Sequence, residues 1–204
     1  MLPLFYDPID TEGIDPTARF PRDRDRLLVG RLIGRSDIEI RRPRLATRGE
    51  LILDLDVHLG DGTATICRDY PAIFTCSIHC QSNFPFRKHR SDLDVPLPDH
   101  VGDDDSLECL DALRPENYDL ILFQAGVDAL AEDVLGRLSL TRDGLKRRNE
   151  RVLDLHERHG IPIALFMGGG YANSITPTVD AFEDLFIAAA KSQQNRGGSA
   201  PTSR

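Results

Sequence analysis

Four short, predominantly apolar runs recur along the chain, each about the length of a β-strand. They end in turn residues or polar side chains and cover residues 51–55, 73–78, 120–125 and 161–167. Continuous apolar runs of this length are typical of strands that are buried on both faces of a parallel sheet. We therefore predict four parallel strands at these positions.

Apolar residues with a helical period lie between and after these runs. Thr141 suits the N-cap of a helix that ends at Gly160, and Thr176-Pro177 suits the start of another. A further helix is predicted near residues 23–33. The helix that begins after Thr141 would carry four residues on one side: Leu145, Val152, Leu153 and His156. The alternation of strands and helices predicts a layered α/β domain.

The two ends of the chain do not follow this alternation. Apart from the helix near residues 23–33, the first 50 residues offer no convincing strand and contain a basic stretch over 35–48. From Gln193 the sequence is polar and rich in Gly and Ser, so we expect a disordered tail over 193–204. The expected organisation is one domain over 1–192, with an N-terminal piece (1–34), an irregular junction (35–50) and a core (51–192).

The amino-acid composition excludes some kinds of binding partner. A length of 204 residues suits one domain, and 40% hydrophobic residues suffice for a core. The net charge of −8 argues against nucleic-acid binding and against a polybasic membrane surface. No apolar run approaches the ~18 residues of a spanning helix, and no signal peptide is evident. The four cysteines form no CxxC pair, so we expect reduced thiols and a cytoplasmic location.

The candidate chemistry begins at the end of the first predicted strand. Asp54, Asp56 and His58 are spaced two residues apart, so in an extended chain their side chains share one face. Three such groups at the end of a buried strand are costly unless they are paired or hold a metal ion. The turn Gly60-Asp61-Gly62 is expected to bring Asp61 back toward the same place.

Two further pieces follow other predicted strands. Asp128 comes just after 120–125, and Gly168-Gly-Gly-Tyr171 comes just after 161–167. The carboxyl ends of parallel strands meet at one edge of a sheet, where sites form. Asp56, His58 and Asp128 would offer two carboxylates and one imidazole and leave a coordination position open, as catalytic zinc sites do. With Tyr171 as a hydrogen-bond donor to an oxyanion, this set suits metal-assisted amide hydrolysis.

The stretch from Leu51 to about Phe186 resembles the zinc-dependent histone deacetylase superfamily, in particular the bacterial histone deacetylase-like amidohydrolases. The matching segments keep the order and spacing of that family and are residues 54–63, 74–79, 83–88, 91–94, 126–128, 135–141 and 168–171. The start of the chain, residues 3–8, 19–21 and 27–28, is also similar. The resemblance implies an arginase/deacetylase-like α/β fold, a mostly parallel sheet with helices on both faces, incomplete at the N-terminal part.

The resemblance also implies a role for individual residues. The zinc ligands would be Asp56, His58 and Asp128, and the catalytic group would be Tyr171. Asp54 and Asp61 match carboxylates that orient two active-site histidines. A structural monovalent cation, usually K⁺, would be held by Asp54, Asp56, His58, Ser77 and the carbonyl of Ile78. The substrate tunnel would include Phe84 and Gly169, and the substrate would be an acetyl-lysine peptide or a small N-acetyl amide.

One departure from the family pattern concerns the general base. Family members carry a tandem His-His upstream of the Asp-x-Asp-x-His strand, whereas here no histidine precedes His58 and no two histidines are adjacent. The block between the N-terminal helix and Leu51 is also missing. We therefore expect a zinc-dependent deacetylase with impaired activity. The missing strands would expose apolar faces and a sheet edge, so marginal stability, aggregation or dependence on a partner is expected.

Two alternatives remain open. The chain could be a non-catalytic remnant, a pseudoenzyme of the same family. It could also be a receiver-like signalling module, because Asp56-Val-His-Leu-Gly-Asp-Gly62 resembles the phosphoacceptor strand end of receiver domains, with Asp56 as the phosphoacceptor. Receiver domains need an acidic pair after a first strand and a later Lys, and neither is evident here.

Overall fold

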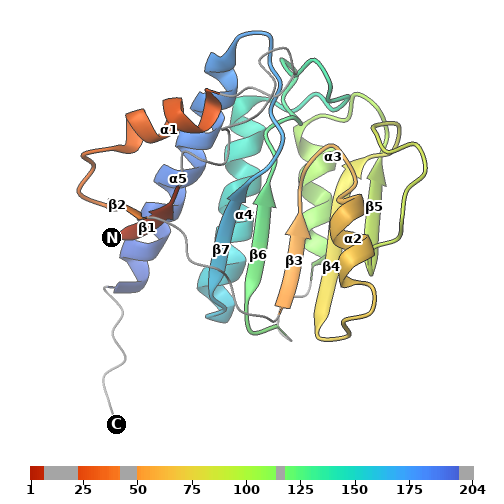
Figure 1. Cartoon of the computed structure of the whole chain (residues 1–204), viewed down its shortest axis with the longest axis horizontal. Coiled ribbons are helices and arrows are strands. Elements are labelled where there is room, and N and C mark those ends of the chain that lie inside the picture. Colours follow the sequence, from red (N-terminus) through yellow and green to blue (C-terminus); the bar gives the residue numbers. More distant parts are fainter. Residues whose placement is uncertain (7–22, 42–49, 114–117, 198–204) are drawn as a thin grey trace.

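The main feature of the fold is a five-stranded, fully parallel sheet (Figure 1). The computed structural model of the chain describes residues 1–6, 23–41, 50–113 and 118–197. The strand order is β5-β4-β3-β6-β7. The strands are β3 (Glu50–Asp54), β4 (Ile73–Cys80), β5 (Leu93–Leu97), β6 (Ile121–Ala125) and β7 (Ile163–Met167). All four predicted strands are confirmed, and β3 lies at the centre of the order between β4 and β6.

Strand β5 was not predicted because its sequence does not read as a buried strand. It contains Asp94 and an exposed Pro96, and it lies at the edge of the sheet, where proline is tolerated. Its position is fixed by pairing with β4, in which His79 lies opposite Pro96.

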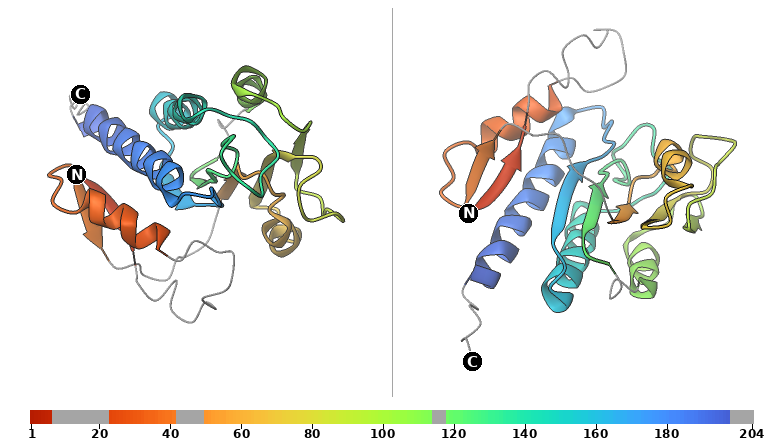
Figure 2. Two further views of the ribbon diagram at one scale, coloured as in Figure 1. Left: turned by 90° about the horizontal axis from the view of Figure 1, so that it is seen from above. Right: turned by 60° about the horizontal axis from the view of Figure 1, so that its bottom comes forward.

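Helices cover both faces of this sheet, as the fold class predicted. Figure 2 shows α3, α4 and α5 on one side and α2 on the other. The helices are α1 (Arg24–Leu32), α2 (Asp61–Cys67), α3 (Asp103–Glu108), α4 (Arg142–His159) and α5 (Ile175–Gly197), with a 3₁₀ turn at Cys109–Ala112. The core between the sheet and α4 and α5 includes the fully buried side chains of Phe123, Val152, Phe182 and Leu185. No helix among the described residues is both long and apolar enough to cross a membrane.

The ends of α4 follow the predicted capping signals, whereas α5 differs from the prediction. Thr141 Oγ1 accepts a hydrogen bond from Gly144 N at 3.0 Å, and Gly160 adopts the left-handed conformation with φ 70°. Helix α5 already begins at Ile175, and Thr176 N donates to Ser174 Oγ. The same helix runs to Gly197, past the expected start of the tail at 193, because extending a formed helix is easier than nucleating one. Residues 198–204 lie outside the described residues.

A second, two-stranded parallel sheet corrects the expectation that the first 50 residues contain no strand. Strand β1 (Leu2–Phe5) pairs with β2 (Ile38–Arg41), with Leu2 opposite Ile38. These strands are only four residues long and mix apolar with polar residues, so they lack the continuous apolar signal of the core strands. Part of the predicted irregular junction, 35–50, is therefore strand, and residues 42–49 lie outside the described residues.

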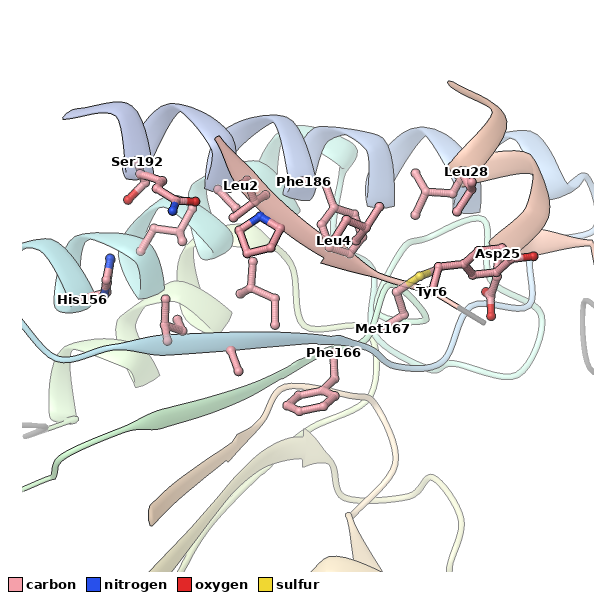
Figure 3. A pocket seen from close by; sticks show the side chains of 18 of the residues that line it. Leu2, Leu4, Tyr6, Asp25, Leu28, His156, Phe166, Met167, Phe186 and Ser192 are labelled. Carbon is pink, nitrogen blue, oxygen red and sulfur yellow. The ribbon is translucent and has the colours of Figure 1, made fainter. Parts of the chain in front are cut away.

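A cavity of about 890 Å³ separates the two sheets. Strands β1 and β7 both line it, together with α1, α4 and α5 (Figure 3). Among the described strands, β1 pairs only with β2 and β7 pairs only with β6. Within the described part of the chain, β1 and β7 are therefore edge strands that both face this cavity.

Candidate metal centre

The predicted metal ligands meet at the carboxyl edge of the five-stranded sheet. Asp56 and His58 follow β3, and Asp128 follows β6. Because β3 and β6 are neighbours, with Asp54 opposite Gln124, their carboxyl ends carry these side chains to one place. The spacing along the sequence and the strand order together produce the cluster.

The three side chains lie within coordinating distance of one ion. One ligand atom from each of Asp56, His58 and Asp128 lies within 4.8 Å of the other two. His58 Nδ1 is 2.9 Å from Asp56 Oδ1 and 3.1 Å from Asp128 Oδ2. The Asp56 and Asp128 side chains are 8% and 0% exposed, whereas that of His58 is 26% exposed. Two carboxylates and one imidazole suit zinc, and the exposed side of His58 leaves access for a further ligand.

Backbone N–H groups hold both carboxylates in place. Gly169 N donates to Asp56 Oδ2 at 2.6 Å, and His58 N donates to Asp56 Oδ1 at 3.0 Å. Val57 N donates to Asp128 Oδ1 at 3.1 Å. Supporting hydrogen bonds of this kind orient metal-binding carboxylates. Gly169, expected in a substrate tunnel, thus lies directly against Asp56 and Asp128, two of the three predicted metal ligands.

The charges within the cluster are strongly coupled. Burial and the neighbouring Asp56 charge raise the pKa of Asp128 well above its ordinary value. For Asp56, burial is outweighed by hydrogen bonds from His58 and other donors, so its pKa falls to about 2. Hydrogen bonds to Asp128 and Asp56 raise the pKa of His58 to about 10. Without a metal ion, these hydrogen bonds favour the protonated form of His58, and a bound metal ion would replace that proton.

Asp54 differs from the other carboxylates because one of its oxygens lacks a partner. Asp54 Oδ1 accepts from Asp56 N at 3.3 Å, whereas the buried Oδ2 has no hydrogen-bond partner among the described residues. Burial, with the Asp56 charge, raises its pKa to about 8. An orphaned, buried carboxylate oxygen suits a cation. The other members of the expected K⁺ set lie nearby in the fold, since Ser77 is opposite Asp54 in the β3–β4 pairing and Ile78 follows it.

Asp61 has a different partner from the one expected. It begins α2 instead of sitting in a turn, and its Oδ1 accepts from His89 N at 2.8 Å and lies 2.8 Å from His89 Nδ1. The carboxylate of Asp61 is therefore paired with His89, a histidine that lies after it in the sequence. Nothing in the local sequence signalled His89, which lies 28 positions further along the chain.

Tyr171 follows β7 and is held by a residue that the sequence analysis did not identify. Its backbone N–H donates to Asp133 Oδ2 at 2.5 Å, and its side chain is half-buried. Burial and the charge of Asp128 raise the pKa of the Tyr171 hydroxyl, so this hydroxyl keeps its proton at neutral pH.

Phe84, the expected tunnel wall, is open to solvent. Its relative exposure is 66%, and its ring makes an edge-to-face contact with Phe86 at a centroid distance of 6.3 Å. Phe86 is also exposed. The described residues thus present these two rings as an exposed aromatic pair.

Comparison with known proteins gives the following matches. A sequence profile of the histone deacetylase domain matches residues 39–182. An uncharacterized protein from Picosynechococcus is 48% identical over 144 residues, which cover 68% of this chain and 48% of that protein. The histone deacetylase-like amidohydrolase of Pseudomonas aeruginosa is 30% identical over 157 residues, which cover 69% of this chain and 41% of the relative.

Solved structures support the same fold. The crystal structure of an HDAC homolog complexed with SAHA matches with a TM-score of 0.57 at 24% identity, over 69% of this chain and 41% of the other. The acetylpolyamine aminohydrolase from Burkholderia pseudomallei matches with a TM-score of 0.57 at 21% identity, over 68% and 44%. The chain spans less than half the length of each of these four proteins.

Proposed function

Since this chain belongs to the histone deacetylase domain family, we propose that it is a zinc-dependent deacetylase of impaired activity, which hydrolyses acetyl-lysine or a related N-acetyl amide. The observation that carries the proposal is the convergence of Asp56, His58 and Asp128 within 4.8 Å at the edge of the sheet. Two of the similar proteins, a histone deacetylase-like amidohydrolase and an acetylpolyamine aminohydrolase, have names that describe amide hydrolysis. Their names support an N-acetyl amide as the substrate class.

The residues of this chain would divide the chemistry as follows. Asp56, His58 and Asp128 would hold zinc, which polarises an amide carbonyl and makes a bound water more acidic. The backbone N–H groups of Gly169 and Val57, which donate to Asp56 and Asp128, would hold the two carboxylates in place for the ion. The protonated Tyr171 hydroxyl would donate a hydrogen bond to the oxyanion that develops on the substrate carbonyl.

Impaired activity follows from the missing general base. No histidine precedes His58 in the sequence, so the family's tandem pair has no counterpart here. General-base assistance contributes about 10²–10⁴-fold in typical enzymes. We expect zinc binding to persist and turnover to be reduced by a factor of this order relative to a family member that has the pair.

A second candidate function is a metal-binding but non-catalytic member of the family. It is favoured by the same missing histidines and by the 66% exposure of Phe84, the residue expected to form a wall of the substrate tunnel. The receiver-like alternative gains no support. Asp56 is buried, and both of its carboxylate oxygens already accept backbone hydrogen bonds.

Metal analysis and an assay of acetyl-lysine peptide hydrolysis on the same purified protein test the proposal. The native chain should bind one zinc ion and hydrolyse the peptide slowly, and Asp128→Asn should lose both properties. Asp154→Asn, on the exposed face of α4, serves as a charge-matched control and should keep both. A native chain that binds no zinc would refute the metal centre. Zinc binding with turnover no higher than that of Asp128→Asn would instead establish the non-catalytic alternative.

A further inference from the structure

A buried arginine of α4 contacts the chain beneath both metal-binding aspartates. Arg148 is only 4% exposed, and its Nη1 donates to Leu55 O at 3.0 Å and to Gly126 O at 2.7 Å. The first carbonyl lies one residue before Asp56, and the second lies two residues before Asp128. One guanidinium nitrogen therefore joins the two strand ends that carry the carboxylates.

The rest of the guanidinium is also fixed. Its Nε and Nη2 both donate to Asn149 Oδ1, at 3.2 and 3.0 Å, and Asn149 is itself fully buried. The guanidinium carbon lies 5.8 Å from the centre of the Phe123 ring. A planar group held on three sides has little freedom to follow a displaced strand end.

The position of this contact is where the regular pairing of β3 and β6 stops. The last backbone bond between the two strands runs from Leu55 N to Gln124 O at 3.0 Å. Beyond it, the ladder no longer sets the distance between the two chains. Just beyond that bond, Arg148 connects the segments that follow β3 and β6. The hydrogen bond from Val57 N to Asp128 Oδ1 connects the same two segments once more.

The positive charge of Arg148 is also favourable at this position, because the carboxylates of Asp56 and Asp128 are nearby. Burial lowers its pKa to about 10, against the opposing effects of Asp128 and Asp56, so the group remains a cation at neutral pH. It is thus a fixed positive charge next to two buried carboxylates, one of which is completely excluded from solvent. A buried cation at this position lowers the cost of keeping both carboxylates ionised for a metal.

We propose that Arg148 is a positioning residue, which sets the separation of Asp56 and Asp128 by fastening both strand ends to α4. This inference rests on the proposed metal centre. The hydrogen bonds of Arg148 go to Leu55 O, Gly126 O and Asn149 Oδ1, so it would act on the ion only through the backbone. Loss of such supporting hydrogen bonds typically weakens metal affinity by about 10–100-fold, and we expect an effect of this size.

Cobalt binding to the purified chain tests this role, because Co²⁺ takes zinc-like ligands and its visible absorption reports on coordination geometry. Arg148→Met should weaken Co²⁺ affinity by about 10–100-fold and change the absorption spectrum. Arg148→Lys keeps the charge but not the planar fork, so it should be intermediate. The matched control is Arg151→Met, which removes an arginine of the same helix that binds a different backbone carbonyl, Leu107 O at 2.8 Å. This control should keep the native affinity and spectrum.

The following results would refute the proposal. Arg148→Met with native affinity and spectrum would show that the ligands are held without it. Equal losses in Arg148→Met and Arg151→Met would show a general effect of weakening α4. If Arg148→Met does not fold, Arg148→Lys decides, and native behaviour of that variant refutes the role. If the native chain itself binds no Co²⁺, both the proposed metal centre and this inference are refuted. If the native chain binds Co²⁺ and the variants do not differ from it, only the role of Arg148 is refuted.

Discussion

At the scale of single residues, the site depends on how closely the backbone approaches the metal ligands. A Cβ atom at position 169 would lie 2.0 Å from Asp128 Oδ2 and 3.0 Å from Asp56 Oδ2. Neither carboxylate can move far, since both are buried and hydrogen-bonded to the backbone. The glycine is therefore required by the space that the two aspartates occupy.

Gly169→Ala should accordingly disrupt the metal centre. We expect zinc affinity to fall by about 100-fold or more, in line with the loss of ligand-orienting contacts, while the fold is retained. Zinc titration against a chelator of known affinity measures the change. Gly62→Ala is the control, because a Cβ there meets nothing within 4 Å. Equal zinc affinities for the two variants would contradict the argument.

The titration of His58 should make the stability of the metal-free protein depend on pH. Its pKa rises from 6.5 to about 10 on folding, so the folded state binds the proton more tightly than the unfolded state does. This contribution to the free energy of unfolding is complete below about pH 6.5 and is lost as pH rises through 10. The pKa of Asp54 also rises on folding, from 3.8 to about 8. Its contribution to the free energy of unfolding is therefore also lost as pH rises, over a lower pH range than that of His58.

Chelator-treated protein should therefore melt at progressively lower temperature between pH 6.5 and 10. His58→Gln removes the titrating group, and its melting temperature should fall less over the same interval. Parallel curves for the native protein and this variant would show that His58 is not protonated in the metal-free fold.

At the scale of elements, α4 links the site to the rest of the domain, and its first turn is stabilised from two sides. Thr141 Oγ1 accepts from Gly144 N and donates to Asp103 Oδ2 at 2.7 Å, which ties the start of α4 to α3. The cap therefore stabilises both the helix and its packing.

Thr141→Ala should lower the free energy of unfolding by about 1–2 kcal/mol. This is the upper part of the usual range for the loss of a threonine at an N-cap. Urea unfolding measures the change. Thr65→Ala, at an exposed position of α2 where the hydroxyl bonds only within its own helix, should cost less. A cost for Thr65→Ala equal to that for Thr141→Ala would contradict the role of the cap.

At the scale of the whole molecule, the described strands form two separate sheets, and their edge strands bear on how the chain associates. Strands β1 and β7 line a common cavity, and among the described strands each pairs on only one side. Phe166 of β7 is half-exposed and points away from β1 (Figure 3). Open strand edges next to exposed apolar side chains favour association.

We therefore expect the purified chain to associate in a concentration-dependent way, measured by sedimentation velocity. Phe166→Lys should reduce this association because it places a charge on the edge strand. Ile66→Lys, which removes an exposed apolar side chain from α2, should reduce it less. A native chain that stays monomeric at all concentrations and melts sharply and reversibly would contradict the expectation.

How far the sequence alone predicts this molecule depends on whether a signal is local. The four core strands, the cap at Thr141 and the stop at Gly160 were predictable because period, capping and φ are properties of a few neighbouring residues. The convergence of Asp56, His58 and Asp128 was predictable for a related reason. Carboxyl ends of parallel strands always meet at one edge, so residues at strand ends can be grouped without coordinates.

The tertiary structure decided what depends on partners far apart in the chain. Strands β1 and β2 are too short and mixed to be recognised singly, and they exist because they pair. Asp61 finds His89, and Arg148 binds a carbonyl 93 positions earlier. Arg148 lies on the buried side of its helix with Leu145 and Val152, and only the packing shows that an arginine is buried there and what it binds. Local chemistry fixes which groups reach the sheet edge, whereas long-range packing fixes which of them hold each other in place.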